Sequence, residues 1–250
     1  MEVHHSHSSS HKKKFKDYLG EFFMIFLAVA AGFFAETFRE SLAESKKEKE
    51  YISSLVSDLQ QDTMLIGRTS KRLLLNIRGQ DSLINLLNHY ANNDSINLKA
   101  YNYFFNYTVS VPQVIFTDRT INQLISSGSM RLIDYKISDS IINYDFITKG
   151  VKIQGNYFNQ QFKTTFDQST EVFDFTIASR TLKDNYTLSA PLLLTATRQS
   201  LVTTDKKVIK KYSSDLTMLE LISLGYVLNL QSAKLQASRL IAQLKKHYNL

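Results

Sequence analysis

The strongest pattern in the chain is an apolar residue at every third or fourth position across residues 52–91. In alternating steps of four and three, the row reads Ile52, Val56, Leu59, Thr63, Ile66, Ser70, Leu73, Ile77, Gln80, Ile84, Leu87 and Ala91. Such spacing puts the row on one face of a helix. The stretch 39–50 before it, RESLAESKKEKE, is rich in good helix formers. We therefore predict one continuous helix ending near residue 91.

The same periodicity returns twice later in the chain. Residues 137–178 repeat it with Ile137, Ile141, Tyr144, Val151, Phe158, Phe162, Phe166 and Phe173. The last stretch repeats it with Leu216, Leu219, Ser223, Tyr226, Leu230, Ala233, Ala237, Leu240, Leu244 and His247. The pattern predicts an all-α protein with an elongated antiparallel bundle of three long helices.

Two connections join these helices. Residues 92–136 hold an Asn-Asn-Asp break, an aromatic stretch at 101–107, Pro112, and a short helix that Thr117 or Asp118 caps. We expect these residues, with their short helices, at one tip of the bundle, and we expect the aromatic stretch to pack there. The helix at 137–178 then returns, residues 179–204 with Pro191–Leu194 lie at the membrane end, and the last helix goes out again.

An uninterrupted apolar run, FFMIFLAVAAGFFA, covers residues 22–35. Extended to residues 18–38 it has 21 positions, enough to cross a bilayer. A buried core helix is the main alternative. A signal peptide cleaved after Ala30 is less favoured, because the apolar stretch continues beyond that residue. A surface-lying helix would need a polar face, which this run lacks. The run predicts a transmembrane helix.

Two sets of residues within this span are candidates for function. The pairs Ala28 with Gly32, and Ala31 with Ala35, have the small-xxx-small spacing that lets helices approach closely in lipid. Glu21 and Glu36 are the acids inside the span, about 22 Å apart along a helix. They are either an intramembrane pair that titrates or couples to a partner, or boundary acids that reach water.

The chain begins with a His/Ser/Lys-rich tail. Residues 1–17 hold His4, His5, His7 and His11, and a lysine cluster directly before the apolar run. Neutral imidazoles can bind metal ions, but no rigid surrounding shell is evident, so we predict a disordered tail and no metal site. Lysines before the span favour a cytoplasmic N-terminus. The expected organisation is a tail at 1–17, a transmembrane helix at 18–38 and a helical-bundle domain at 39–250.

Three stretches of the chain carry a family resemblance. They are the first forty residues, MEVHHSHSSSHKKKFKDYLGEFFMIFLAVAAGFFAETFRE, then FTDRTINQLISSGSMRLI at 116–133, and the terminal LIAQLKKHYNL. The chain resembles a family of bacterial single-pass membrane proteins described as a domain of unknown function. The resemblance implies one N-terminal membrane helix and a helical soluble part, and it implies no activity, ligand or catalytic residue. We therefore expect the protein in a bacterial inner membrane, and the lysine cluster before the span favours residues 39–250 outside the cytoplasm.

The composition argues against several functional classes. Eight glycines and two prolines in 250 residues are too few for a sandwich, a barrel or a many-loop enzyme, and cysteine is absent. No nucleotide-binding, zinc-protease or serine-hydrolase motif occurs, so we predict no catalytic residues and no cofactor. A net charge of +7, partly concentrated in the tail, does not indicate nucleic-acid binding.

The remaining function is recognition. We predict a membrane-anchored bundle that acts through protein–protein contacts, with the lipid bilayer and either a protein partner or a second copy as its partners. Residues 97–135, at the expected tip, are the predicted recognition segment. Two alternatives stay open: an extracytoplasmic sensor-like subunit that signals through a partner, and a homo-oligomeric membrane assembly or channel.

Overall fold

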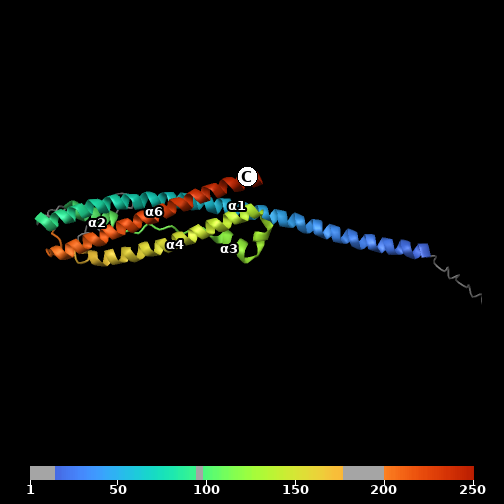
Figure 1. The fold of residues 1–250 in the computed structure, drawn as a ribbon, viewed down its shortest axis with the longest axis horizontal. Coiled ribbons are helices and arrows are strands. Elements are labelled where there is room, and N and C mark those ends of the chain that lie inside the picture. The colour runs from blue at the N-terminus through green and yellow to red at the C-terminus, as the bar shows by residue number, and fades with distance from the viewer. Residues whose placement is uncertain (1–14, 94–97, 177–199) are drawn as a thin grey trace, which may run out of the picture. The chain divides into compact units, whose positions relative to one another are not determined.

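The computed structural model describes residues 15–93, 98–176 and 200–250, and every regular element among them is a helix (Figure 1). The helices are α1 (Phe15–Asn93), α2 (Leu98–Tyr107), α3 (Arg119–Ser126), the 3₁₀ helix η1 (Ser129–Leu132), α4 (Tyr135–Ser169) and α6 (Lys206–Tyr248). The all-helical prediction is confirmed for these residues. Contacts divide the chain into two units, Met1–Glu50 and Tyr51–Leu250.

The first unit is the beginning of α1. Among the described residues, one helical stretch is long and apolar enough to cross a membrane. It is Tyr18–Tyr90, which lies within α1. Its most apolar window has a mean hydropathy of 1.9, and none of that window is buried. The predicted long N-terminal helix is therefore present, and it carries one candidate membrane span.

The second unit is built around the predicted apolar rows. On α1, every described member of the row from Ile52 to Leu87 is buried except Thr63, which is half-buried. On α6, all members of the predicted row are buried except His247, which is exposed. The helix α6 also begins ten residues before the predicted Leu216, at Lys206, where Asp205 caps its first turn by accepting from the Lys207 N–H.

Three clusters of buried side chains fix the direction of the long helices. At one end, called here the Ile52 end, Leu55 of α1 packs in one cluster with Ile137 of α4 and Leu244 of α6. At the opposite end, called the Leu87 end, Leu87 packs with Phe173 and with Tyr212 of α6. Hence α4 runs in the same direction as α1, and α6 runs against both (Figure 1).

The predicted path of the chain is wrong in this respect. The helix at 137–178 does not run back toward the Ile52 end, and the last helix does not run toward the Leu87 end. Leu201 lies in the cluster of the Leu87 end, so the described part of 179–204 is at that end and not at the Ile52 end. Pro191–Leu194 lie outside the described residues.

The physical reason is an extended segment, residues 108–118, that carries the chain back along α1. Polar residues at seven-residue spacing on α1 hold its backbone. Asp62 Oδ1 accepts from the Thr117 N–H at 2.8 Å, Thr69 donates to the Gln113 carbonyl at 3.4 Å, and Asn76 donates to the Ser110 carbonyl at 3.4 Å. Seven helical residues rise about 10.5 Å, which three or four extended residues match. The segment therefore follows this polar row in register.

As a result, the short helices lie at both ends and not at one tip. Helix α2 packs at the Leu87 end, where Phe104 stacks on Phe173 with ring centroids 4.2 Å apart. Helix α3 packs at the Ile52 end through Ile121 and Leu124. Asp118 is the N-cap residue of α3, as predicted, although no side-chain cap bond forms there.

Helix α4 is shorter than the predicted 137–178. It begins at Tyr135, where Asp134 accepts from the Lys136 and Ile137 N–H groups, and it ends at Ser169. The Phe173 N–H then bonds to the Ser169 carbonyl in a turn. The turn ends the helix, and beyond it Phe173 packs against Phe104 and Tyr101 of α2.

Candidate interaction surface

Large apolar side chains form an exposed row along the outside of α4. Its members are Tyr135, Ile142, Phe146, Ile153 and Tyr157, with exposed fractions of 81, 51, 74, 59 and 57%. Their spacing of seven, four, seven and four residues keeps them within about 60° of one another around the helix. We call these five residues the α4 row.

The α4 row lies opposite the buried side of the same helix. Ile141, Tyr144, Val151 and Phe158, the members of the predicted periodic pattern, are buried. The helix thus has two apolar faces, and α1 and α6 cover one of them. An exposed apolar stripe about 33 Å long is larger than the scattered single residues found on most protein surfaces.

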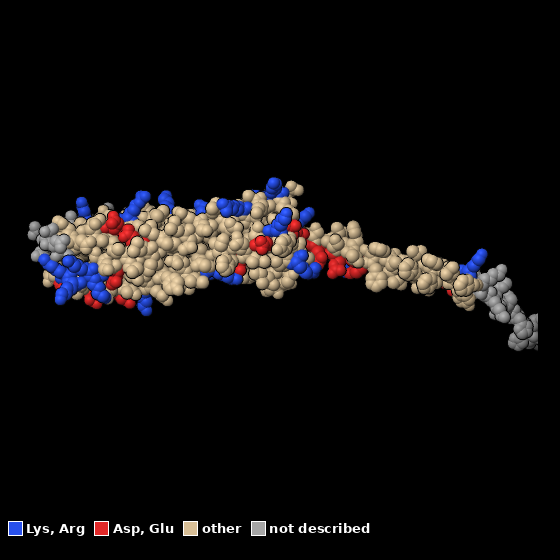
Figure 2. Space-filling model, viewed as in Figure 1, with Lys and Arg blue, Asp and Glu red and all other residues tan. Residues whose placement is uncertain are grey.

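Two charged residues, Asp139 and Lys149, lie on the same face of α4 as the row. In Figure 2 the middle of the second unit is mostly tan, whereas the largest group of Lys and Arg atoms lies at the Leu87 end, where α6 begins with Lys206 and Lys207. Lys149, on the same face of α4, is paired with Asp145 at 2.5 Å. The charge of Lys149 is therefore balanced within its own helix.

A second, weaker apolar row follows the outside of α6. Leu221, Leu224, Leu228 and Leu235 are 59, 39, 66 and 54% exposed. This row contains no aromatic residue, and Tyr and Trp are enriched among the few residues that dominate the binding free energy at protein interfaces. We therefore take the α4 row as the candidate surface and the α6 row as its natural comparison.

Two buried aspartates on α1, Asp58 and Asp62, hold neighbouring segments in place. Asp58 accepts from Arg119 at 2.8 Å and from the Thr120 hydroxyl at 2.5 Å. Asp62 accepts from the Tyr144 hydroxyl at 2.8 Å in addition to the Thr117 N–H. Burial, together with the adjacent Asp62 carboxylate, raises the pKa of the Tyr144 hydroxyl far above its usual range, so this group stays protonated. These bonds fasten α3 and α4 to α1.

The residues predicted within the apolar span are all exposed. Ala28, Ala31, Gly32 and Ala35 have exposed side chains or backbone, and a Cβ built on Gly32 would meet no atom within 4 Å. Glu36 pairs with Arg39, whose Nη2 lies 2.5 Å from Oε1. Glu21 and Glu36 sit on one continuous helix, so the structure does not bring the two carboxylates together.

The predicted recognition segment, 97–135, contributes several side chains to the core. Tyr101 and Phe104 are 0% exposed, which confirms that the aromatic stretch packs. Other side chains of the segment are exposed, among them Ile115, Ile125 and Tyr135 at 82, 50 and 81%. The α4 row was missed because its members were not separated from the buried pattern on the same helix. Plotting both sets around the helix axis would have distinguished the two faces.

Comparison with known proteins adds no family assignment. No protein-family model, no curated protein and no solved structure matches the chain. No group of three or more His, Asp or Glu side chains suited to a metal ion occurs among the described residues. The histidines of the N-terminal tail lie outside them.

Proposed function

We propose that the protein is a membrane-anchored helical protein that acts through protein–protein contacts, and that its first contact is with a second copy of itself. The α4 row is the observation that carries this proposal, since five large apolar side chains are left without a cover. The apolar run at 22–35 supports the anchor, because none of it is covered by protein in the described residues. The proposed setting is a bacterial inner membrane, with the N-terminus in the cytoplasm and the helical bundle outside.

The size of the row fits a dimer. Three aromatic and two isoleucine side chains with these exposures present roughly 600 Å². Two such rows packed together would bury about 1,200 Å², which is the lower end of the range for specific, stable interfaces. Anchoring both copies in one bilayer raises their effective concentration and favours an interface of this size.

A parallel arrangement of the two α4 helices suits the anchor. Both copies continue into the first unit at the Ile52 end, through Tyr51. Parallel pairing keeps these two ends together, as two anchors in one bilayer require. In this arrangement each member of the row faces its own counterpart, so Phe146 packs against Phe146 and Ile153 against Ile153, as in a coiled-coil seam.

Light scattering on the full-length protein in detergent tests the dimer. We expect the wild type to have the mass of two chains and the Phe146→Glu, Ile153→Glu double variant to have the mass of one. Leu228→Glu, at a 66% exposed position on the α6 row, is the matched control and should stay dimeric. A monomeric wild type, or dissociation by Leu228→Glu as well, would contradict the α4 interface.

Cross-linking tests the orientation. The chain has no cysteine, so single cysteines report one position each. Parallel pairing predicts that Phe146→Cys forms a disulfide between copies under mild oxidation, and that Ile153→Cys does the same. If neither single variant links while a mixture of the two does, the helices pair in opposite directions and the parallel arrangement is wrong.

A further inference from the structure

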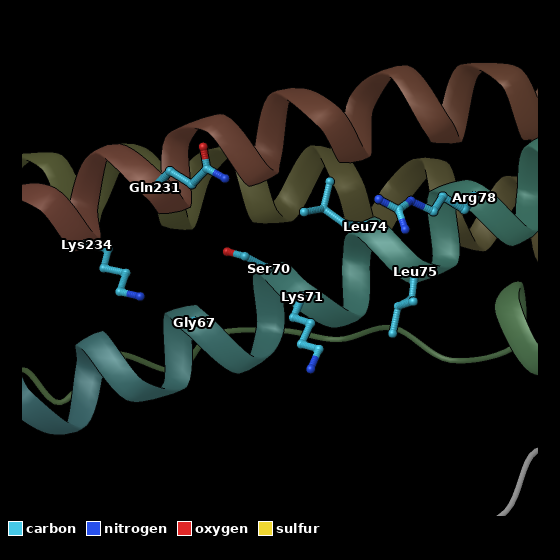
Figure 3. A pocket seen from close by; sticks show the side chains of 8 residues that line it. All are labelled: Gly67, Ser70, Lys71, Leu74, Leu75, Arg78, Gln231 and Lys234. Atoms are coloured by element: carbon cyan, nitrogen blue, oxygen red, sulfur yellow. The ribbon is translucent and has the colours of Figure 1, made fainter.

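A shallow groove follows the surface of α1. One part of it is a cavity of about 450 Å³ between α1 and α6, lined by Gly67, Ser70, Lys71, Leu74, Leu75, Arg78, Gln231 and Lys234 (Figure 3). Two further depressions continue it along α1 toward Ser57; they share Met64 and Arg68, and one of them shares Gly67 with the cavity. From Ser57 to Arg78 the groove is about 32 Å long. We call this surface the basic groove.

The charges of the basic groove all have one sign. Arg68, Lys71, Arg78 and Lys234 line it, and no aspartate or glutamate does. None of these four side chains makes a hydrogen bond or ion pair among the described residues. Three other cations on this unit form ion pairs: Arg119 pairs with Asp58, Lys149 with Asp145 and Lys152 with Asp118. Four neighbouring cations without a counter-charge make this surface attractive to an anion.

A buried hydroxyl group at the base of the groove also lacks a partner. Ser70 is 8% exposed, and its Oγ forms no hydrogen bond. Figure 3 shows this side chain directed toward α6, on the same side of α1 as Leu74. Buried polar atoms usually have a partner, so Ser70 is suited to donate to an oxygen of a bound molecule.

Lys234 closes one end of the cavity. It reaches from α6 toward α1, so that a Cβ built on Gly67 would lie 3.3 Å from its Nζ (Figure 3). Arg78 lies at the other end, and the apolar side chains Leu74 and Leu75 lie between them. The arrangement is an apolar strip with a positive charge at each end.

We propose that the basic groove binds an acidic segment of a partner polypeptide, with carboxylates at Arg68, Lys71, Arg78 and Lys234 and apolar side chains over Leu74 and Leu75. The length of the groove favours a polypeptide over a small anion, because about ten extended residues span 32 Å. The alternation of cations with Met64, Leu74 and Leu75 favours a segment that carries both acidic and apolar residues. This surface is separate from the α4 row, so the inference does not depend on self-association.

Fluorescence anisotropy with the full-length protein in nanodiscs of phosphatidylcholine tests this inference. The probe is a fluorescein-labelled peptide of ten residues that alternates glutamate with leucine, and the same peptide with lysine for glutamate is its control. We expect the acidic peptide to bind and the basic peptide not to bind. Exposed ion pairs are screened by salt, so affinity should fall at least about fivefold between 50 and 300 mM salt.

Charge reversal then locates the binding. Arg78→Glu and Lys234→Glu should each weaken binding about tenfold. Arg239→Glu, an exposed arginine on α6 outside the groove, is the matched control and should change it less than about twofold. Circular dichroism verifies that each variant keeps its helices. Phe146→Glu, which disrupts the proposed dimer, should bind the peptide normally, so failure of either proposal is recognised without the other.

Three results would overturn the inference. The first is equal binding by wild type and an Arg78→Glu, Lys234→Glu double variant, and the second is an equal loss from Arg239→Glu. The third is no peptide binding while wild type, but not the double variant, binds vesicles of phosphatidylglycerol. In that case the groove contacts an anionic lipid surface and not a polypeptide.

Discussion

Helix α1 is strongly apolar in two regions, and the two differ in what covers them. In residues 22–35 nearly every position is apolar, and Phe22, Phe26 and Phe34 are 62, 56 and 77% exposed. In residues 52–87 apolar residues come every three or four positions, and Ile52, Leu59 and Leu73 are at most 1% exposed. A one-sided row is covered by neighbouring helices, whereas a run that is apolar all round needs an apolar medium on every side. The pattern, and not the apolar content alone, distinguishes a core face from a candidate membrane span.

The largest expected effect comes from placing charged residues in the first region, 22–35. Phe26→Arg with Val29→Arg puts two charges near the middle of the run, at a cost of about 6 kcal/mol for insertion into a bilayer. We expect wild type in the membrane pellet after ultracentrifugation without detergent and the double variant in the supernatant, still helical by circular dichroism. Ser53→Arg with Ser54→Arg, at exposed positions of the second region, should stay in the pellet. Wild type in the supernatant would remove the anchor from the proposal.

The next largest effect comes from removing a buried side chain in the second region, 52–87. Leu59 is 1% exposed, so Leu59→Ala leaves a cavity and should lower the free energy of unfolding by about 2–5 kcal/mol. Leu27→Ala is the matched change in the first region, where Leu27 is 61% exposed, and should alter stability by less than about 0.5 kcal/mol. Urea unfolding in one detergent, followed by circular dichroism, measures both. Equal losses would mean that protein also covers the first region.

Two glycines of α1 sharpen the comparison. Helix propensity alone predicts that Gly→Ala stabilises either position by up to about 1 kcal/mol. A Cβ on Gly79, however, would overlap the Tyr107 ring, whereas a Cβ on Gly32 would meet nothing within 4 Å. We therefore expect Gly79→Ala to destabilise the protein by about 1–3 kcal/mol and Gly32→Ala not to destabilise it.

The same urea titration tests whether Tyr107 is the reason that Gly79→Ala destabilises the protein. Replacing Tyr107 with glycine removes both the ring and the Cβ that the new Cβ would meet, so Gly79→Ala should cost little in a Tyr107→Gly background. A full loss in that background would show that the close approach of Tyr107 is not what requires glycine at residue 79.

The long helices were predictable because their signal is local. Spacing along the chain identified the buried rows of α1 and α6 almost residue by residue, since a helix has one period and one face. The direction of the helices was not predictable in this way. Direction depends on which segment pairs with the polar positions of α1, and apolar periodicity carries no information about that.

The signal that was missed is a second row of buried positions on α1, beside the apolar row. Leu55, Asp62, Thr69, Asn76 and Leu83 are spaced by seven, and all are buried. Its polar members looked like solvent-facing residues until the extended segment 108–118 was seen to cover them. Likewise, the α4 row and the basic groove depend on which neighbouring helices cover each face, so their exposure could not be known from the sequence.

The smallest expected effect concerns ion pairs, where an exposed pair is compared with a pair whose carboxylate is buried. Asp118 and Lys152 pair at 2.8 Å with both side chains exposed by 40% or more, unlike the buried Asp58 with Arg119. The hydrogen bond from Lys152 lowers the pKa of the Asp118 carboxyl below its ordinary 3.8. The stabilisation that the ionised Asp118 gives to the folded protein is therefore complete at pH values above 3.8, and it is lost as the pH falls through the lowered pKa. Because water screens the pair, Asp118→Asn should cost at most about 0.5 kcal/mol at pH 7 and less at pH 2. Urea unfolding of both proteins at the two pH values measures this, and a loss above about 1.5 kcal/mol at pH 7 would mean that exposure does not set the strength of these pairs.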